Sequence, residues 1–562
     1  MNIRIYTLVS IAVATAFAGC RSTVVVSAGK PSSVCVRSVQ YVPAVGLSDD
    51  TTVEVLLQND GRDSIVISRV ELDGLGLTEI RASRFRGLKA FRFGGVFGGK
   101  RGKPEAGSAA RWWRIYPSSE LAPGGFAVLQ INFAGSSFPH EVRLSLSDGH
   151  DLMVRVPRYS SPVRRIEHLS FPDDGKSVHV RYSKGPAPEK VLVNGLKCPS
   201  AKVLETGDAG APGAVVVPLA QSVRDGDPIL LELQFPRGVK CFAFVRAFVG
   251  LCFVAPDGRR DDRPLAKDER QRYGFDSDMK FYRVPIDVAC EDVRAHAPGT
   301  SAKDVVSEIR NYLDRNPSGL TAVDVCTAQY PTVWNIYSQV ADAVVVKPYR
   351  LHWGADASRF EEEEISFVRA KAVDVSPRPI IWVPERFSRG GGICGEAFET
   401  MAWAVLMNGA RGMRIHNWMN GNADPFAGNP GMGEAIVRFS EFLQTNRSDF
   451  ASLIPMRTIE RRDPRLTVHE GWVGDRAVIL QVRNLLYDNG LSSRKGTERG
   501  DRVVMVRKDV DVKYPVPKWM RPTRAIDMAT GRPLELHVNN GVAEIRLPVL
   551  SEYSLVKILN EN

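Results

Sequence analysis

The chain has 562 residues, a formal net charge of +10 and a pI near 9.2. This length exceeds what one hydrophobic core normally supports and predicts several domains. The 74 Lys and Arg residues are interspersed with 64 acidic residues and form no long basic run, which argues against nucleic-acid binding and favours a basic, solvated surface. Beyond the N-terminal segment no run of 18 or more apolar residues occurs, so the pattern predicts no later membrane span.

Residues 1–20 have the features of a targeting segment. Arg4 supplies a positive start, residues 8–18 are apolar, and small residues precede Cys20. The segment resembles a bacterial lipoprotein signal peptide. This resemblance implies export and a lipid anchor at Cys20, which would hold the protein to a membrane of the cell envelope, at the outer membrane or cell surface. An ordinary cleaved signal and an uncleaved anchor are the alternatives, and each version exports the chain.

Seven cysteines remain after Cys20, an odd number, widely spread and without CxxC spacing. We therefore expect neither a disulfide framework nor a structural metal site. Cys252, Cys290 and Cys326 lie in apolar runs and are interpreted as buried thiols.

Two β-rich domains follow, over residues 21–160 and 163–238. In the first, runs such as Val53–Leu57 and Phe126–Phe133 alternate with Asn-Asp-Gly and Pro-Gly-Gly turns, a pattern typical of a β-sandwich. In the second, Val178–Tyr182 and Pro228–Phe235 are separated by similar turns. Neither domain contains a recognisable catalytic motif, so packing or carbohydrate contact is the expected role.

From residue 239 to 456, strands and helices alternate. Phe242–Val254 is a nearly continuous apolar run and predicts a strand buried on both faces, as do Leu320–Cys326 and Asp342–Val346. Phe360–Ala372 has the periodicity of a helix and begins with acidic residues. This alternation predicts a parallel α/β domain, and a TIM-type barrel is favoured because no phosphate-type glycine loop follows a strand. Six strands are recognisable where a full barrel has eight.

The most informative stretch is residues 378–418. Pro379–Pro384 predicts a buried strand that ends on Glu385, Glu396–Asn408 predicts a helix, and Gly412–His416 predicts the next strand. Such a βαβ unit places Glu385 and the sequence His416-Asn417-Trp418 at the carboxyl ends of neighbouring strands. In a βα barrel, this end carries the chemistry.

Three segments of this domain carry a family resemblance. They are VADAVVVKPY at 340–349, RPIIWVPERF at 378–387 and ETMAWAVLMNGARGMRIHNW at 399–418. Together they resemble the last part of a glycoside-hydrolase TIM barrel, although Lys347 stands where those barrels often have Asp. The resemblance implies cleavage of glycosidic bonds and places Glu385 at the nucleophile position.

Glycosidases of this kind use two carboxylates on either side of the scissile bond. Glu385 is the first candidate, with a rim salt bridge to Arg386 or Arg389 as the alternative. Glu291 and Asp292 follow the predicted strand Tyr282–Ala289 and are the candidate partners, Glu291 being slightly favoured; a capped, solvated loop is the alternative.

Further polar and aromatic residues near strand ends have the composition of a sugar-binding cleft. These candidate substrate-binding residues are Asp287, Asp324, Lys347, Tyr349, His352, Trp353, Trp382, His416, Asn417 and Trp418. Asp324 could pair with Lys347, a pairing equally consistent with a structural and a catalytic role. Because GxSxG and HExxH are absent and Gly390–Gly392 does not fit a nucleotide loop, we expect no cofactor.

Residues 457–562 return to a β pattern and predict a C-terminal β-sandwich. The sequence thus predicts a multidomain protein in which β-sandwich domains flank a central (β/α) barrel. The expected function is an exported glycoside-hydrolase-like enzyme acting on a poly- or oligosaccharide. The alternative is a non-catalytic glycan-binding surface lipoprotein with a degenerate barrel.

Overall fold

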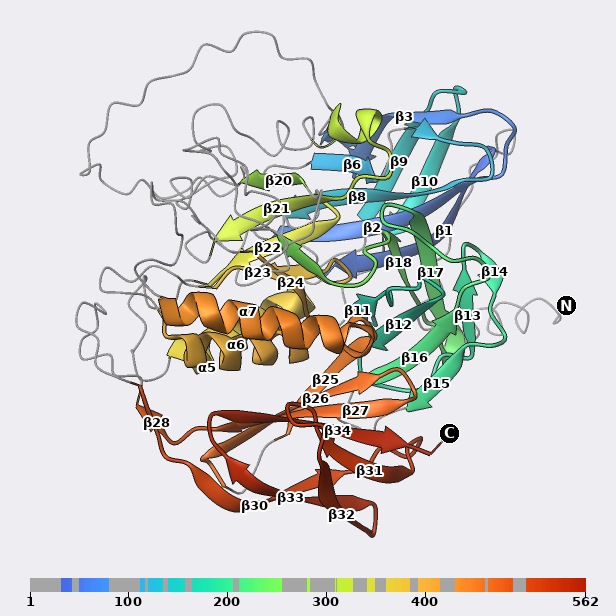
Figure 1. Ribbon diagram of the computed structural model, residues 1–562. Coiled ribbons are helices and arrows are strands. Elements are labelled where there is room, and N and C mark those ends of the chain that lie inside the picture. Colours follow the sequence, from blue (N-terminus) through green and yellow to red (C-terminus); the bar gives the residue numbers. More distant parts are fainter. Residues whose placement is uncertain are drawn as a thin grey trace, which may run out of the picture.

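A computed structural model shows four packed domains (Figure 1). It describes residues 32–42, 50–79, 112–116, 120–134, 140–156, 164–205, 212–254, 280–283, 309, 311–326, 341–348, 360–384, 393–414, 430–459, 463–488 and 502–561. Two β-sandwiches come first, followed by a parallel sheet with helices and by a C-terminal β domain.

The first sandwich has two sheets that enclose one apolar core. One sheet contains β1 (Val34–Val42), β2 (Asp50–Asn59), β8 (Phe126–Ala134), β6 (Trp112–Tyr116) and β5 (Thr78–Glu79) in that order. The other contains β10 (Asp151–Val156), β9 (His140–Leu146), β3 (Ile65–Leu72) and β4 (Leu75–Gly76), with β7 (Glu120–Leu121) paired to β3. Buried residues alternate with more exposed ones along β9 and β10, as a half-buried strand requires.

The second sandwich has two sheets of four strands each. One contains β11 (Ile166–Ser170), β12 (Ser177–Tyr182), β16 (Gly213–Pro218) and β15 (Lys202–Glu205). The other contains β14 (Leu196–Lys197), β13 (Lys190–Val193), β17 (Pro228–Gln234) and β18 (Lys240–Arg246), with the short helix η1 (Pro236–Gly238) between its last two strands. Both sheets of this domain contribute side chains to one apolar core.

The expected single strand Phe242–Val254 is instead two strands in different domains. β18 pairs antiparallel with β17 and completes the second sandwich, whereas β19 (Cys252–Val254) opens the parallel sheet. The chain changes direction at Gly250, whose φ of 72° favours glycine. The boundary expected at residue 239 therefore lies after Arg246. Apolarity continues through the break because both strands are buried, in different cores.

The parallel sheet has six strands in the order β19–β24–β23–β22–β21–β20. Their bounds are β20 (Lys280–Arg283), β21 (Thr321–Cys326), β22 (Ala343–Lys347), β23 (Ile380–Trp382) and β24 (Ala410–Arg414), besides β19. From β20 to β24 the chain order is the spatial order, and the first strand, β19, lies beside the last. All five pairings are parallel. The described strands show no pairing between β19 and β20, so the expected TIM-type barrel, which the sequence indicated as possibly incomplete, is not shown to close.

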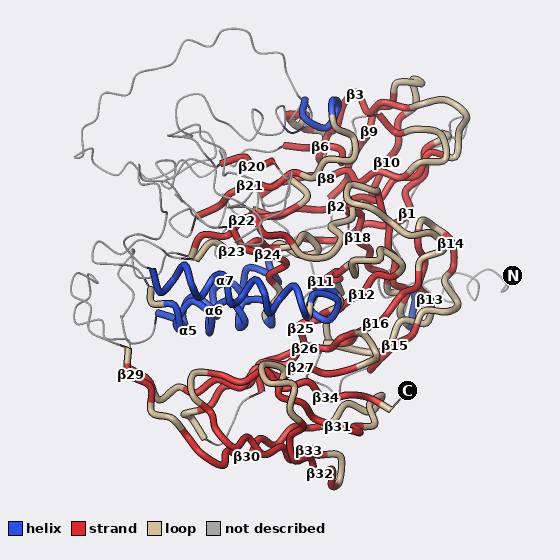
Figure 2. Tube along the Cα trace, viewed as in Figure 1, coloured by secondary structure: helices blue, strands red, loops and turns tan. Residues whose placement is uncertain are grey.

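Helices cover one face of this sheet. They are α5 (Phe360–Asp374), α6 (Gly395–Met407), α7 (Pro430–Thr445) and α8 (Arg447–Ala451). Figure 2 shows α5, α6 and α7 as a layer between the parallel sheet and the C-terminal strands. α6 is buried nearly all round because it packs on the sheet, on α7 and on the C-terminal domain. Among the described residues, no helix is long and apolar enough to cross a membrane.

The C-terminal domain is an eight-stranded sheet folded around a core to which Leu204 and Ala214 of the second sandwich also contribute. In spatial order its strands are β25 (Leu453–Ile459), β26 (Leu466–Val473), β27 (Ala477–Asn484), β34 (Tyr553–Asn560), β31 (Pro522–Asp527), β32 (Pro533–Asn539), β33 (Val542–Leu550) and β30 (Arg507–Pro515). β28 (Tyr487–Asp488) and β29 (Val503–Val504) form a separate pair. β25 belongs to this sheet, so the C-terminal domain begins at residue 453 and not at the expected residue 457.

A buried polar network ties three of the domains together. Asp342, just before β22, accepts hydrogen bonds from Tyr116 of the first sandwich (2.9 Å) and from Arg246 of the second (3.0 Å). The same carboxylate accepts from the backbone and the hydroxyl of Thr321 at the start of β21. These contacts fix the amino ends of the parallel strands against both sandwiches.

Candidate functional site

Side chains of the parallel strands alternate between two buried faces. Val323, Val344 and Trp382 belong to the core that the helices share, whereas Ala322 and Val345 belong to a separate apolar layer on the opposite face. We call this opposite side the inner face. By the same alternation, the inner face carries Asp324 in β21 and Lys347 at the end of β22.

Three charged side chains meet on the inner face at the carboxyl ends of the strands. The Lys347 ammonium and the Arg414 guanidinium, from β22 and β24, both contact Oδ2 of Asp324 in β21; the Arg414 Nη1–Oδ2 distance is 2.9 Å. All three side chains are at most 2% exposed. We call Asp324, Lys347 and Arg414 the charge cluster. A buried carboxylate requires such partners, because desolvation without them would be severe.

The Arg414–Asp324 contact also reports the shape of the sheet. β24 and β21 are separated by β23 and β22, so on a flat sheet they would lie three strand spacings apart, about 14 Å. Side chains stand roughly perpendicular to a flat sheet, so an arginine and an aspartate in these two strands would not meet there. The sheet therefore curves around its inner face and brings the carboxyl ends of its strands toward one another.

The expected pairing of Asp324 with Lys347 is confirmed. Sequence reasoning missed Arg414, the second cation on the same carboxylate. The available signal was an arginine two residues after Gly412 in a strand expected to be buried, which requires an acidic or carbonyl partner in the interior.

Trp382, expected to line the cleft, lies on the other side of the sheet. Its indole N–H donates to Glu364 of α5 at 2.8 Å, and its ring stacks on Phe398 of α6 with centroids 6.1 Å apart. The side chain has no exposed surface. Trp382 is therefore a core residue between the sheet and the helices, because its strand position points it away from Val345 and Ile381.

The other predicted site residues lie outside the described residues. They are Cys20, Asp287, Glu291, Asp292, Tyr349, His352, Trp353, Glu385, His416, Asn417 and Trp418. Val383 and Pro384 follow β23 and precede Glu385, and Arg414 ends β24 two residues before His416. Within the part of the chain that the structure describes, no group of three or more His, Cys, Asp or Glu side chains could hold a metal ion.

No family model and no curated protein sequence matches this chain. Solved structures similar to it are glycoside hydrolases. An alpha-amylase from H. orenii matches with 11% identity over 46% of this chain and 57% of its own, at a TM-score of 0.30. A maltogenic alpha-amylase from Thermotoga neapolitana matches with 14% identity over 49% of this chain and 73% of its own, at a TM-score of 0.28. The Thermotoga maritima alpha-fucosidase in complex with fucose matches with 9% identity over 47% of this chain and 50% of its own, at a TM-score of 0.25.

Proposed function

We propose that this protein is an exported, lipid-anchored enzyme that hydrolyses glycosidic bonds in a poly- or oligosaccharide, with its active site at the carboxyl edge of the parallel sheet. The observation that carries this proposal is the curved six-stranded sheet with the charge cluster at that edge. The chain order of β20 to β24, with β19 beside β24, is the order of a βα barrel, whereas doubly wound open sheets reverse their strand order near the middle.

The proposed mechanism uses two carboxylates, one on each side of the scissile bond. Glu385, directly after β23 and its flanking Val383 and Pro384, is the proposed nucleophile or base. Glu291 or Asp292 is the proposed partner. The charge cluster would place two cations beneath them, held in position by their contacts with Asp324. The resemblance of residues 1–20 to a lipoprotein signal peptide, in which Cys20 would be lipidated, supports the proposal of export to the cell envelope.

Hydrolysis of a polysaccharide panel by the wild type and by Glu385→Gln tests this proposal. We expect turnover of at least one substrate and a loss of about 100-fold or more in kcat for Glu385→Gln, because the variant removes a reacting carboxylate but keeps its shape. Glu434→Gln is the matched control, since Glu434 is an exposed residue of α7 (side chain 74% exposed). Full activity of Glu385→Gln would refute the assignment.

The second candidate function is glycan binding without turnover. Asp324 is the one carboxylate among the described strand residues of the inner face, and two cations already contact it. A carboxylate held in this way is a poor candidate for a reacting group, which favours binding without turnover. Saturable binding of a glycan by the wild type, with no hydrolysis of that glycan on prolonged incubation, would establish this alternative.

A further inference from the structure

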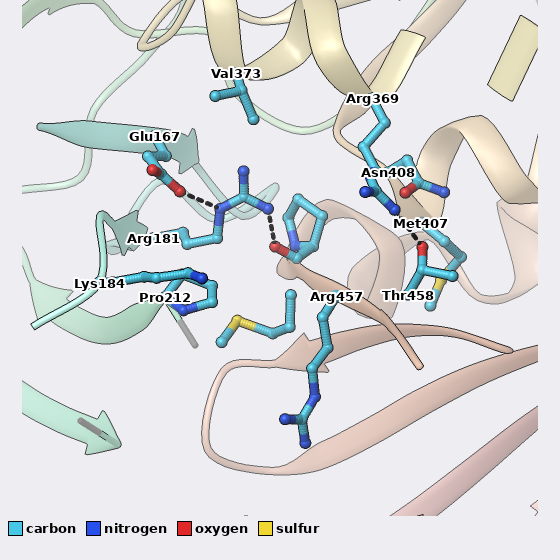
Figure 3. A pocket seen from close by; sticks show the side chains of 12 residues that line it. Glu167, Arg181, Lys184, Pro212, Arg369, Val373, Met407, Asn408, Arg457 and Thr458 are labelled. Atoms are coloured by element: carbon cyan, nitrogen blue, oxygen red, sulfur yellow. Dashed lines mark hydrogen bonds and ion pairs between the residues drawn. The ribbon is translucent and has the colours of Figure 1, made fainter. Parts of the chain in front are cut away.

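A separate pocket lies where three domains meet (Figure 3). Its walls come from β11 and β12 of the second sandwich, from α5 and the end of α6, and from β25 of the C-terminal domain. The cavity measures about 300 Å³, at the small end of ligand pockets. We call it the junction pocket. It lies apart from the charge cluster, with which it shares no lining residue.

The lining of the junction pocket is strongly cationic. Arg181, Lys184, Arg369 and Arg457 line it, and Glu167 is its single acidic lining residue. Figure 3 shows these side chains arriving from opposite walls. The positive charges outnumber the negative one, so the cavity has a potential that attracts anions.

Two of these cations form no ion pair with a carboxylate in the described part of the chain. Glu167 is shared between Arg165 and Arg181, and Arg457 pairs with the buried Glu470 at 2.7 Å. Arg369 donates to the Thr458 hydroxyl (2.8 Å), and the described ion pairs of the pocket lining involve Arg181 and Arg457 but neither Arg369 nor Lys184. Arg369 and Lys184 are therefore the donors available to a ligand.

The surrounding groups record the same positive field. Burial lowers the pKa of Arg181, Glu167 offsets part of this, and Arg165 and Arg369 lower the pKa further. Burial also holds the pKa of His469, which contacts Thr458, well below its ordinary value, and Arg483 and Arg369 add to the effect. An anion in the pocket would relieve this repulsion among cations.

We infer that the junction pocket binds an acidic sugar through its carboxylate or sulfate group. Arginine and lysine supply charge-assisted hydrogen bonds to such oxyanions. Val373, Met407 and Met456 supply apolar surface on which the C–H face of a sugar ring can pack. The sugar part of this inference rests on the proposed function, whereas the oxyanion part rests on the pocket alone.

Titration calorimetry with galacturonate, galactose 6-sulfate, galactose and inorganic sulfate tests this inference. The proteins are the wild type, the double variant Arg369→Gln/Lys184→Gln, and the control Arg524→Gln/Lys508→Gln, which makes the same charge change on the C-terminal domain, away from the pocket. We expect one or both acidic sugars to bind at least about tenfold more tightly than galactose, and the double variant to lose at least about tenfold in that affinity. The control should bind as the wild type does.

The two acidic probes distinguish a carboxylate from a sulfate ester as the preferred group. Equal affinities in the wild type and the double variant would overturn the site, and binding of inorganic sulfate without either acidic sugar would overturn the sugar assignment. Binding at the junction pocket is measured without turnover. A failure to bind acidic sugars would therefore not affect the hydrolysis test with Glu385→Gln, and binding would support the junction pocket even if no hydrolysis were found. Unchanged thermal unfolding of both double variants confirms that they fold, as expected for exposed Arg369 and Lys184.

Discussion

At the scale of single residues, two buried carboxylates are each held by two cations from other elements. Asp324 lies between Lys347 and Arg414, and Glu361 of α5 contacts Arg483 and Arg502 of the C-terminal domain. Burial raises the pKa of Glu361, while the two arginines oppose that rise. Such pairs specify which strands and helices meet, because each charge is unfavourable in any arrangement that leaves it alone.

The charge cluster predicts an asymmetry between two substitutions. Asp324→Asn removes the carboxylate that both cations contact and should lower the free energy of unfolding by about 3–5 kcal/mol. Lys347→Met should lower it less, because Arg414 still balances Asp324 and the methionine fills the apolar layer. Urea unfolding followed by tryptophan fluorescence measures both values. A larger loss for Lys347→Met than for Asp324→Asn would show that the carboxylate is not what the cluster is organised around.

Residue-level prediction succeeded where strand alternation and charge pointed to the same partner. Asp324 and Lys347 stand in neighbouring buried strands, so their pairing followed from the sequence. Trp382 was predicted to line the cleft because it lies near the end of a strand. Strand alternation instead places its side chain on the face that the helices cover. The junction pocket was not predictable, since its lining spans Glu167 to Thr458 and the sequence does not show which segments meet.

At the scale of elements, glycine at Gly412 allows β19 to pair with β24. A Cβ at this position would lie 2.1 Å from the backbone oxygen of Cys252. The pairing places the first strand of the parallel sheet beside the last strand in chain order. The same neighbour relation occurs between the first and last strands of a βα barrel. Close packing of backbone on backbone there excludes any side chain.

Gly412→Ala should therefore push β19 from the sheet and lower the free energy of unfolding by about 1–3 kcal/mol, as overpacking does. Gly431→Ala is the matched control, because a Cβ there meets nothing within 4 Å in the first turn of α7. Hydrogen exchange read by mass spectrometry should show faster exchange of the amides of Cys252–Val254 in Gly412→Ala alone. Unchanged exchange in that segment would contradict the packing argument.

Elements were predictable from sequence where burial and period agreed. β21, β22, α5 and α6 match the expected strands and helices within a few residues, because strands buried on both faces and strongly periodic helices have clear patterns. The run from Phe242 to Val254 failed because apolarity does not reveal a change of domain. Gly250 was the available signal, since an isolated glycine in an apolar run can mark a sharp turn.

At the scale of the whole molecule, the second sandwich, the helical layer and the C-terminal domain meet around three buried histidines, His168, His179 and His469. The His179 Nδ1–H donates to the Ser452 carbonyl at 2.7 Å, which links β12 to the segment between α8 and β25. Burial lowers the pKa of His179 to about 4 and holds those of His168 and His469 well below the ordinary value. Nearby arginines, Arg411 among them, add to the first two shifts.

These histidines should make the assembly of domains sensitive to acid. In the unfolded chain an imidazole takes up a proton near pH 6.5, but folded His179 does so only near pH 4. Between these values the unfolded state binds more protons, so the stability present above pH 6.5 is lost as the pH falls toward 4. His179 alone should account for a loss of about 3 kcal/mol across this window, with further losses from His168 and His469.

Urea unfolding between pH 7 and pH 4.5 measures this loss in the wild type and in His179→Gln, whose amide can still donate to the Ser452 carbonyl but does not titrate. We expect the variant to lose distinctly less stability than the wild type over that range. His537→Gln is the control, because it removes an exposed imidazole from the C-terminal domain and leaves the three junction histidines in place. If His179→Gln lost as much stability as the wild type, acid would act on this protein elsewhere than through the contact between β12 and Ser452.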